Sequence, residues 1–475
     1  MYCGIDIGTS AIKCAIIDEG GAVVGFGRAG VGLYRGAHPD AWESDPAEWL
    51  KATANAFGQA AAVPGYDPAR LRGLAISGNG PTLVAAGADG LPIGLASSWM
   101  DRSAVAEAER VSIAAGRRID PSFYLPKALK LMEGPLADNI KRFFSGPEYL
   151  AFMLGALPVS FLPDPFYDRH IWDLETAAAL GLDEALFPPY IAPARTIGRV
   201  SAQAAEATGL PAGLPLVSAF PDFLAALAGS GTVRPGMACD RSGSSEALNL
   251  CATKPFADLS IFSLPHAIPG LWNLSGGLST SGKALEWFSR AGGYTGGETD
   301  NLNREAAQVA PGAGGVLFLP YLTGERAPLW NKDIRGAFLG LSMNNGRKEM
   351  ARAVLESIAF ALRLSAERMA TGGFAVDVVR CSGGAARDGT LNTIKAGVLK
   401  VPVEIPLLPD SEPMGDACAV AVALGDHQSL EEASRAMVGI GKIFKPEREL
   451  TGLYDDRYSA WKQALDAVLG LSGEF

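Results

Sequence analysis

The sequence predicts an α/β protein with more than one domain. The chain has 475 residues, which is too long for a single hydrophobic core. Its hydrophobic content of 48% and its 57 glycines fit many tight turns between buried strands and helices. Strand-like and helix-like segments also alternate along both halves of the chain. Two or three α/β domains are therefore expected.

The first segments predict a β-hairpin followed by a helix. "YCGIDIGTS" and "AIKCAIIDEG" have the composition of strands, and residues 14–26 alternate loosely about the "DEGG" turn. "SDPAEWLKATANAFGQAAA" predicts an amphipathic helix, with Ser44 or Asp45 as the N-cap and Pro46 at the first helical position. "LRGLAIS" then predicts a buried strand, and "LPLVSAF" predicts a strand that leads into Asp222.

The second half repeats this theme. "ACD" leads into a glycine- and serine-rich turn and then an apolar strand, as at the N-terminus. This faint internal duplication predicts a boundary near residues 232–237, and therefore domains 1–235 and 236–475. "GGVLFLPYL", "RKEMARAVLESIAFALRLSAERMA" and "DVVRCSGGAA" continue the second domain as strand, helix and strand.

Composition excludes several classes of function. The net charge of −10 and the absence of a basic stretch argue against a nucleic-acid partner. No apolar run reaches the roughly 20 residues that span a bilayer, and the sequence begins with strand-like residues, so a cytoplasmic protein without a membrane partner is expected. Six cysteines without a C-x-x-C pair predict reduced, buried thiols, and four scattered histidines do not predict a metal site.

Three glycine- and hydroxyl-rich turns follow apolar strands, and they point to phosphate binding. They are Gly8-Thr9-Ser10, Ser242-Gly243-Ser244-Ser245 and Gly383-Gly384-Ala385. Small residues let backbone N–H groups approach phosphate oxygens. The chain lacks a G-x-x-x-x-G-K-[ST] motif, and no G-x-G-x-x-G pattern follows the first strand. These turns predict a nucleotide held between two similar halves.

Two acidic residues are candidates for the chemistry. A carboxylate at Asp6, inside an apolar strand, is costly without a partner. Beside Lys13 and the first turn it can hold Mg²⁺ through water, and the alternative is an acid that stabilises the hairpin. Asp222 follows a strand and precedes a small-residue helix. It can be a helix N-cap or the general base of a phosphoryl transfer, and spacing alone favours the cap.

A second group of residues is typical of a pocket for a small hydroxylated molecule. Asn79 lies in "SGNGPTL", and Trp99, Asp101 and Arg102 lie in "SSWMDRS". A tryptophan beside an acid and an arginine can line such a pocket. An ordinary surface salt bridge with a partly buried tryptophan explains the same residues equally well.

These motifs resemble those of the FGGY carbohydrate kinases, in the actin/Hsp70/hexokinase-like ATPase superfamily. The resemblance covers nearly the whole chain, and its most specific part is "GAFLGLSMNNGRKEMARAVLE", preceded by "YLTGERAPLWN". It implies two RNase-H-like domains that flank a cleft, with ATP and Mg²⁺ inside and a small sugar or polyol against the N-terminal domain. Dimers are common in that family, so a homodimer is an expected assembly.

The resemblance also implies roles for individual residues. Asp222 matches the catalytic base, and Asp6 matches the Mg²⁺-associated acid. The remaining nucleotide-side matches are Gly8, Thr9, Ser10, Lys13, Gly243, Ser244, Ser245, Gly282, Gly383, Gly384 and Asn392. The substrate-side matches are Gly78, Asn79, Trp99, Asp101, Arg102 and Phe223.

The chain departs from the family pattern mainly on the substrate side. Phe223 replaces an asparagine that would bond a sugar hydroxyl, and "SGNGPT" replaces a Met-His-Gly segment. Glu246 stands where glycine is common, and the Thr-x-x-Lys of a family signature becomes Tyr124-Leu125-Pro126-Lys127. The ATP-side and base positions are kept, whereas the substrate-side positions have changed. The resemblance, which is to xylulokinase-like members, therefore implies an active kinase of an untypical subgroup, with a substrate that can differ from xylulose.

We therefore expect ATP-dependent phosphorylation of a primary hydroxyl, with a ketose as the first candidate acceptor. Glycerol, erythritol and gluconate are alternatives within the same family. Two rivals come from another class: an ATPase that switches conformation without a small-molecule acceptor, and an inactive regulatory protein with the same fold.

Overall fold

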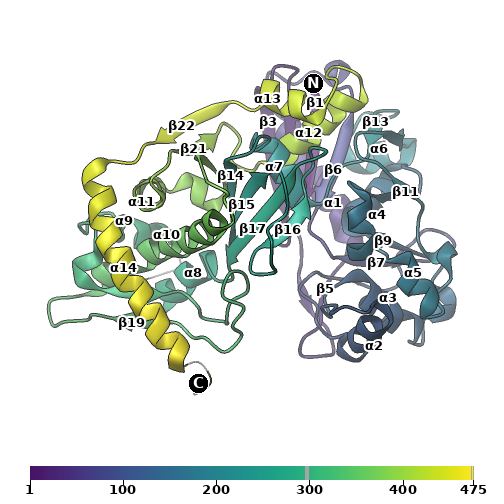
Figure 1. Cartoon of the computed structure of the whole chain (residues 1–475). Helices are drawn as coiled ribbons and strands as arrows, with labels where there is room; N and C mark the ends of the chain where they lie inside the picture. The colour runs from purple at the N-terminus through teal and green to yellow at the C-terminus, as the bar shows by residue number, and fades with distance from the viewer. Residues whose placement is uncertain (295–298, 472, 474–475) are drawn as a thin grey trace. The chain divides into compact units, whose positions relative to one another are not determined.

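The computed structural model describes residues 1–294, 299–471 and 473, and it divides into two compact units. The first unit contains Met1–Gly229 and Glu412–Met437, and the second contains Ser230–Ser411 and Val438–Phe475. The chain thus leaves the first unit six residues before the boundary that the sequence suggests at 235/236. It also returns to the first unit late, in a segment that the sequence analysis assigned to the second domain. Figure 1 shows the elements in chain order.

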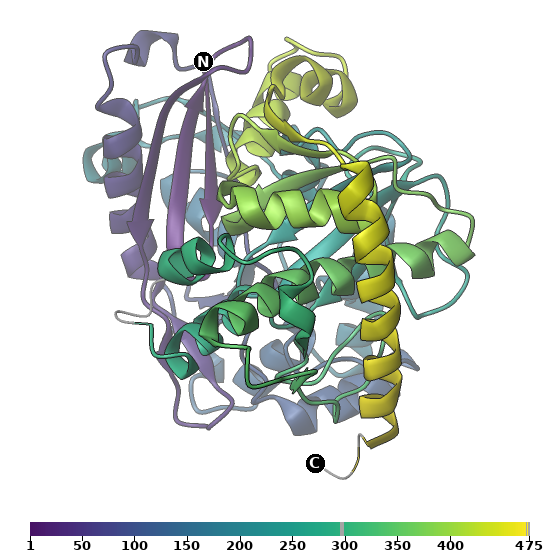
Figure 2. The same ribbon diagram turned by 90° about the vertical axis from the view of Figure 1, so that its left-hand side faces the viewer.

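The main sheet of the first unit has the strand order β12-β13-β6-β1-β2-β3. The antiparallel hairpin predicted from the sequence forms its β1, β2 and β3 edge, and these purple strands lie side by side in Figure 2. In contrast, β1, β6 and β13 run parallel, so their carboxyl ends meet at one edge of the sheet. The strand bounds are β1 Tyr2–Ile7, β2 Ala11–Ile17, β3 Val23–Gly30, β6 Leu74–Gly78, β12 Thr196–Arg199 and β13 Pro215–Val217.

Helices cover both faces of this sheet. On one face, α1 (Pro46–Ala61) packs so tightly on β3 that a Cβ atom at Gly25 would lie 1.9 Å from the Ala60 carbonyl oxygen. On the opposite face, α12 (Glu412–Ala423) packs on β1, where a Cβ atom at Gly4 would lie 1.9 Å from the Pro413 oxygen. The predicted cap of α1 is confirmed as Asp45, whose carboxylate accepts from the Ala47 N–H.

A second, smaller sheet of the first unit has the order β4-β5-β8-β7-β9. A separate apolar core, which includes Phe143, Trp172 and Phe187, lies beneath it. Its strands are β4 Tyr34–Arg35, β5 Trp42–Ser44, β7 Leu83–Ala86, β8 Ala96–Ser97 and β9 Arg142–Ser145. The remaining helices and strands of the unit are α2 Val105–Ala115, α3 Tyr124–Met132, α4 Gly146–Leu154, α5 Leu174–Ala179, α6 Ala202–Thr208, α7 Asp222–Gly229, α13 Leu430–Met437, β10 Ser160–Phe161 and β11 Tyr190–Ile191.

The second unit has a seven-stranded sheet of order β16-β17-β15-β14-β20-β21-β22. The predicted second hairpin is confirmed as β14 and β15, and β14 runs parallel to β20. The strand bounds are β14 Met237–Ser242, β15 Glu246–Ala252, β16 Phe262–Pro265, β17 Trp272–Leu278, β18 Leu317–Leu319, β19 Ala337–Leu339, β20 Val378–Gly383, β21 Val403–Pro406 and β22 Ile440–Phe444.

The core of the second unit forms around its longest helices. Phe360 of α10 stacks near Trp461 of α14, with ring centroids 5.9 Å apart, and Trp461 donates to the Phe318 carbonyl. Figure 2 shows α14 as the long yellow helix. The helices are α8 Gly282–Ala291, α9 Thr299–Ala306, α10 Arg347–Thr371, α11 Gly389–Leu399 and α14 Arg448–Leu471. The two-unit α/β fold expected from the sequence is confirmed.

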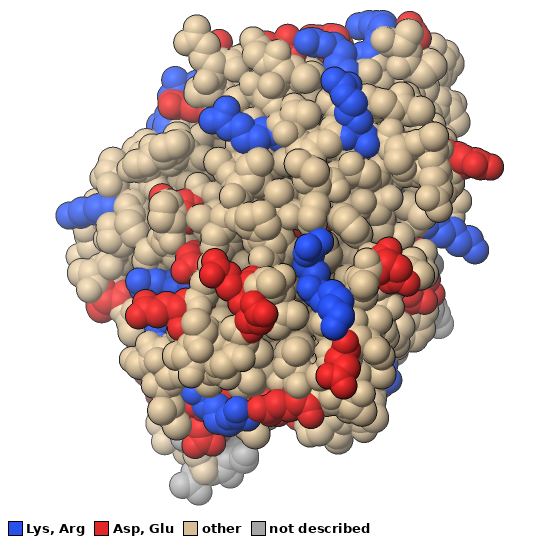
Figure 3. Space-filling view, turned by 90° about the vertical axis from the view of Figure 1, so that its right-hand side faces the viewer, with Lys and Arg blue, Asp and Glu red and all other residues tan. Residues whose placement is uncertain are grey.

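Three other features bear on the functions that composition excluded. Among the helices that the structure describes, none is both long and apolar enough to cross a membrane. All six cysteines are buried free thiols, as predicted. On the face of the molecule shown in Figure 3, acidic and basic side chains are interspersed.

Candidate active site

The predicted site residues of the first unit gather where parallel strands end. Asp6 is the penultimate residue of β1 and pairs with Ser77 of β6 in the parallel register. The next residue of β6, Gly78, forms a parallel bridge with Pro221, directly before Asp222. The sheet therefore brings Asp6, Gly78 and Asp222 to one edge, which is where α/β sheets bind ligands.

Asp6 has the partner that its burial requires. Its carboxylate is 3% exposed, and Oδ2 lies 3.4 Å from Nζ of Lys13, the residue opposite it on β2. The same Nζ lies 3.7 Å from Oε2 of Glu412, at the start of α12. One ammonium group thus sits between two buried carboxylates. Sequence analysis missed Glu412 because it is distant in the chain and has no local motif.

A third acid, Asp416, is completely buried next to this cluster. Its Oδ2 accepts hydrogen bonds from the Ser77 hydroxyl at 2.8 Å and from the Ser77 N–H at 3.3 Å. Burial, with the charges of Asp6 and Glu412, raises the pKa of Asp416 well above its usual range. These surroundings therefore disfavour a further negative charge at Asp416, behind β1.

The tip of the first hairpin is tied to the substrate-side loops. The Gly8 N–H donates to the Ala11 carbonyl at 3.0 Å, which closes the turn, and Ser10 lies exposed at its end. Thr9 accepts at Oγ1 a 2.9 Å hydrogen bond from the indole N–H of Trp99. The predicted nucleotide-side and substrate-side residues thus make direct contact here.

Asn79 is held by the backbone of β1 and by Thr82. Its main-chain N–H and its side-chain amide both donate to the Ile7 carbonyl, at 2.9 and 3.0 Å. The Asn79 Oδ1 accepts a hydrogen bond from the Thr82 hydroxyl at 2.6 Å. The Thr82 Oγ1 in turn accepts one from the main-chain N–H of Trp99 at 3.2 Å. Asn79 therefore has a fixed orientation beside the strand ends.

Lys127 ties together the two loops that carry Asn79 and Trp99. It projects from α3, is 2% exposed, and donates at 2.7 Å to the carbonyls of Pro81 and Ser98. Burial lowers the pKa of Lys127 from 10.5 to about 7, although the charges of Asp101 and Asp120 oppose this shift. Lys127 is the lysine of the segment Tyr124-Leu125-Pro126-Lys127, which departs from the Thr-x-x-Lys of a family signature, and its contacts here give it a structural role.

Asp101 and Arg102 point to different partners. The buried Asp101 carboxylate accepts from the Ser97 hydroxyl at 2.5 Å and from the Ser103 N–H at 2.8 Å. The Arg102 guanidinium is 61% exposed and pairs with Asp120. Asp101 therefore helps to shape the loop, whereas Arg102 lies in a surface ion pair, and a substrate role for either residue stays a prediction.

Asp222 is the first residue of α7 and not the cap before it. Its Oδ1 accepts from the Phe223 N–H at 2.7 Å, and the side chain is half-buried. A carboxylate in the first turn of a helix is favoured by the helix dipole. The Phe223 ring lies 6.3 Å from that of Tyr167, so one side of this turn has an aromatic wall.

The second unit brings its predicted residues to the ends of β14 and β20. The tip of the hairpin, Gly243 and Ser244, is exposed, and the Gly243 N–H donates to the Ser245 carbonyl at 2.8 Å. The Gly282 and Lys283 N–H groups, at the start of α8, donate to the Gly243 and Ser244 carbonyls at 3.1 and 3.2 Å. A Cβ atom at Gly282 would lie 2.4 Å from the Gly243 oxygen, so this contact requires glycine.

The third glycine turn is anchored from both sides. Gly383 has φ +82°, and a Cβ atom there would lie 2.0 Å from the Ser242 carbonyl oxygen. Gly384 lies exposed beyond it. Asn392 is completely buried, and its amide donates at 2.8 Å to the carbonyls of Ala385 and Asp388. Asn392 therefore fixes the backbone of the turn from within.

These residues fit the groups that the resemblance implies. At Gly8, Gly282 and Gly383 a Cβ atom would lie 2.9, 2.4 and 2.0 Å from a backbone oxygen, so these turns fold closely only with glycine and their tips stay exposed backbone. Asp6 is a hard oxygen ligand of the kind that Mg²⁺ takes through water and phosphate oxygens. Among the residues that the structure describes, no cluster of three or more His, Cys, Asp or Glu could hold a metal alone.

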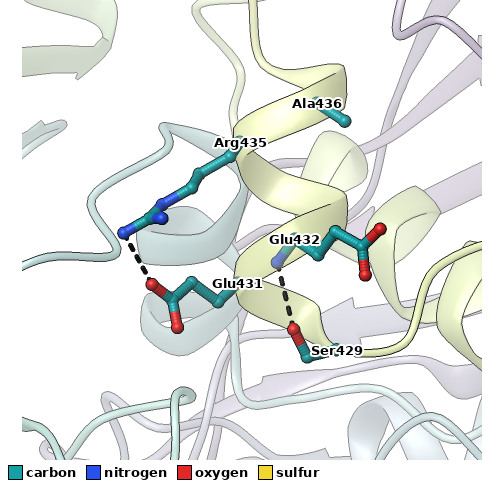
Figure 4. A pocket seen from close by; sticks show the side chains of 5 residues that line it. All are labelled: Ser429, Glu431, Glu432, Arg435 and Ala436. Carbon is teal, nitrogen blue, oxygen red and sulfur yellow. Dashed lines mark hydrogen bonds and ion pairs between the residues drawn. The ribbon is translucent and has the colours of Figure 1, made fainter.

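A hollow elsewhere on the first unit contains none of these residues. It has a volume of about 480 Å³ and lies along α13, where Arg435 pairs with Glu431 at 2.6 Å (Figure 4). The Ser429 hydroxyl, directly before α13, accepts a hydrogen bond from the Glu432 N–H in the first turn of this helix. The hollow is lined by residues on the surface of a helix, where Arg435 pairs with Glu431 and Glu432 accepts from the Gln428 N–H, and it holds none of the residues predicted for the reaction.

Comparisons with known proteins show the family to which this chain belongs. Residues 1–120 match the N-terminal domain of the FGGY family of carbohydrate kinases, and residues 241–424 match its C-terminal domain. A xylulose kinase from Staphylococcus epidermidis is 26% identical over 97% of this chain and 96% of its own length. A xylulose kinase from Klebsiella pneumoniae is 30% identical over 76% of this chain and 77% of its own length.

Other relatives carry different names. A glycerol kinase from Gloeobacter violaceus is 27% identical over 97% of this chain and 95% of its own length. Among solved structures, a "xyloylose kinase" from Brucella ovis superposes with a TM-score of 0.83 and 26% identity, covering 99% of both chains. Both family domains and the whole fold therefore match, and this chain belongs to the FGGY family of carbohydrate kinases, which are phosphotransferases.

Proposed function

We propose that this kinase transfers the γ-phosphoryl group of ATP to a primary hydroxyl of a small sugar or polyol, with a ketose as the first candidate. The observation that carries the proposal is the meeting of Asp6, Gly78 and Asp222 at the ends of adjacent parallel strands. Phosphoryl transfer needs positioning, neutralised charge and a proton acceptor, and this edge carries residue types for each task.

The proposed reaction proceeds by in-line attack of the acceptor hydroxyl on the γ-phosphorus. Asp222 takes the hydroxyl proton as the new O–P bond forms, and the bond to the β,γ-bridging oxygen breaks to release ADP. The tip of the first hairpin and the Gly243–Ser245 loop offer backbone N–H and hydroxyl donors to the phosphate oxygens. Mg²⁺ held through water near Asp6 would supply positive charge to the phosphates. Gly383, Gly384 and the Asn392-supported turn would contact the adenosine.

The acceptor would lie against Asn79, Trp99 and Phe223. Trp99 and Asn79 share Thr82 as a hydrogen-bond partner, so they would present a fixed polar edge to the hydroxyl groups. Phe223 and Tyr167 supply an aromatic side, which favours the C–H face of a small carbohydrate. The glycerol kinase among the relatives makes a polyol the second candidate acceptor.

Asp222→Asn tests the role of the proposed base. ADP release is measured with MgATP and a panel of pentuloses, hexuloses, polyols and aldonates. With the best acceptor, kcat should fall at least about 100-fold while the KM for ATP stays within a factor of two. Asp183→Asn, at an exposed helix cap, is the matched control and should keep full activity. Near-normal turnover by Asp222→Asn would refute the assignment, and ATP binding without turnover on any acceptor would favour the inactive regulatory rival.

A further inference from the structure

A buried ion cluster lies directly behind the Gly243–Ser245 loop. Nζ of Lys395 lies 2.5 Å from Oδ2 of Asp240 and 2.5 Å from Oε1 of Glu246. All three side chains are 0% exposed. Three ionisable groups without solvent are costly to bury, so such a cluster persists only where its geometry satisfies them.

The cluster contacts both roots of the loop, by which we mean the ends of β14 and β15 that flank it. Glu246 is the first residue of β15, immediately after the loop, and pairs across the hairpin with Ser242. Asp240 lies two residues before Ser242 on β14, and therefore on the same face of the sheet. Lys395 reaches this face from α11, 149 residues away from Glu246 in the chain. A single ammonium group thus joins both strands of the hairpin to one helix.

Glu246 also extends the network to the start of α8. Its second oxygen, Oε2, accepts a short hydrogen bond from the Ser281 hydroxyl. The next residues, Gly282 and Lys283, are those whose N–H groups hold the loop carbonyls. The position of Glu246 therefore determines how the start of α8 meets the loop.

The charges of the cluster are mutually balanced. Burial and the Glu246 charge raise the pKa of Asp240 to about 8, and Lys395 opposes this shift. Burial opposes the charged forms of Glu246 and Lys395. For Glu246 the attraction of Lys395 outweighs burial and lowers the pKa, and for Lys395 the attraction of Asp240 and Glu246 outweighs burial and raises the pKa. These directions favour charges on Lys395 and Glu246 and disfavour a third charge on Asp240.

We propose that Lys395 is a positioning residue for the nucleotide phosphates, because it fixes both roots of the Gly243–Ser245 loop through Asp240 and Glu246. The same helix carries Asn392, one turn earlier, which fixes the Gly383–Asp388 turn. Helix α11 therefore sets the spacing between the phosphate loop and the adenosine turn. This inference rests on the proposed binding of ATP phosphates by the loop. The ion pair with Lys395 also explains why an acid is tolerated at position 246, because the ammonium group offsets the negative charge that would otherwise repel phosphate.

The test measures binding of Mg·ADP, of a non-hydrolysable Mg·ATP analogue and of adenosine by calorimetry, alongside the thermal midpoint of unfolding. Lys395→Met should weaken both phosphate-bearing ligands at least tenfold and leave adenosine within twofold. The double variant Lys395→Met/Glu246→Gln removes the stranded charge. The thermal midpoint of the double variant should return towards that of the wild type. Its affinity for Mg·ADP should stay at least fivefold weaker than that of the wild type, because α11 no longer holds the loop.

Arg352→Met is the matched control. It breaks another buried ion pair of the same unit, in which the Arg352 Nε lies 2.9 Å from Oε1 of Glu356. This variant should lower the thermal midpoint without changing nucleotide affinity. Wild-type affinity in Lys395→Met, or recovery of affinity together with stability in the double variant, would overturn the positioning role. If the wild-type protein itself bound neither phosphate-bearing ligand, the proposed ATP site would fail instead.

Discussion

The buried ammonium of Lys127 should make the stability of this protein rise with pH above neutrality. In the unfolded chain this lysine keeps its proton up to its ordinary pKa of 10.5, whereas in the folded protein its pKa is about 7. Above about pH 7 the unfolded state therefore binds more protons than the native state, and the free energy of unfolding increases with pH. The reason is that the native state no longer has to hold a desolvated positive charge.

The magnitude follows from these two values. The limiting slope for one proton is about 1.4 kcal/mol per pH unit. Half of the folded molecules still carry the proton at about pH 7, so the gain between about pH 7 and about pH 9 is about 2 kcal/mol. Urea unfolding of the wild type and of Lys127→Met, at several pH values in this window, measures the difference directly.

The Lys127→Met comparison separates titration from lost contacts. The variant loses the two hydrogen bonds to Pro81 and Ser98, so its stability is lower at every pH, but the gap to the wild type should widen as the pH rises. Thr82→Val is the control, because it removes the bond to Asn79 in the same pair of loops without removing a titratable group. A gap that stays constant between about pH 7 and about pH 9 would refute a buried ammonium with a lowered pKa.

Two further substitutions test the turns. Gly383→Ala should destabilise the protein by about 2 kcal/mol or more in urea unfolding, because alanine disfavours φ +82° and its Cβ would lie 2.0 Å from the Ser242 oxygen. Gly384→Ala has open space around its Cβ and should change the free energy of unfolding by less than about 0.5 kcal/mol; equal losses in the two variants would contradict the steric argument. Trp99→Phe removes the 2.9 Å bond to Thr9 and should cost about 1 kcal/mol in the same assay while raising the KM for the acceptor, and an unchanged KM would speak against Trp99 in the substrate pocket.

Local sequence patterns predicted the parts of the site that depend on local structure. Both hairpins, with glycine and hydroxyl residues at their tips, follow from alternating apolar strands that meet small-residue turns. The cap at Asp45 follows from an acid placed directly before a proline. For Asp222 the pattern left two alternatives open, a helix N-cap and a general base, and spacing alone favoured the cap. The structure instead makes Asp222 the first residue of α7, a shift of one position that sequence spacing cannot resolve.

Contacts between residues that are distant in the chain could not be predicted from local sequence patterns. Glu412 reaches Lys13 because α12 returns to the first unit, and no local signal marks that return. Glu246 could be recognised as an unusual acid, but its partner Lys395 lies in an otherwise ordinary helical segment. A lysine at a position where its helical neighbours are apolar was the available signal, both for Lys395 and for Lys127.

The charge balance beneath the two hairpins explains how acids can be tolerated beside proposed phosphate sites. In the first unit Lys13 sits between Asp6 and Glu412, and in the second Lys395 sits between two carboxyl groups. Two ionised acids against one ammonium would leave a net negative charge that repels phosphate. In the second unit the pKa of Asp240 near 8 keeps that carboxyl protonated at neutral pH, so the cluster is close to neutral. Asp6 lies near the end of β1, beside the hairpin tip, where we propose that it holds Mg²⁺ through water. The two proposed phosphate sites thus differ in how the acids beneath them are balanced: Lys13 does so in the first unit, and Lys395 together with the raised pKa of Asp240 does so in the second.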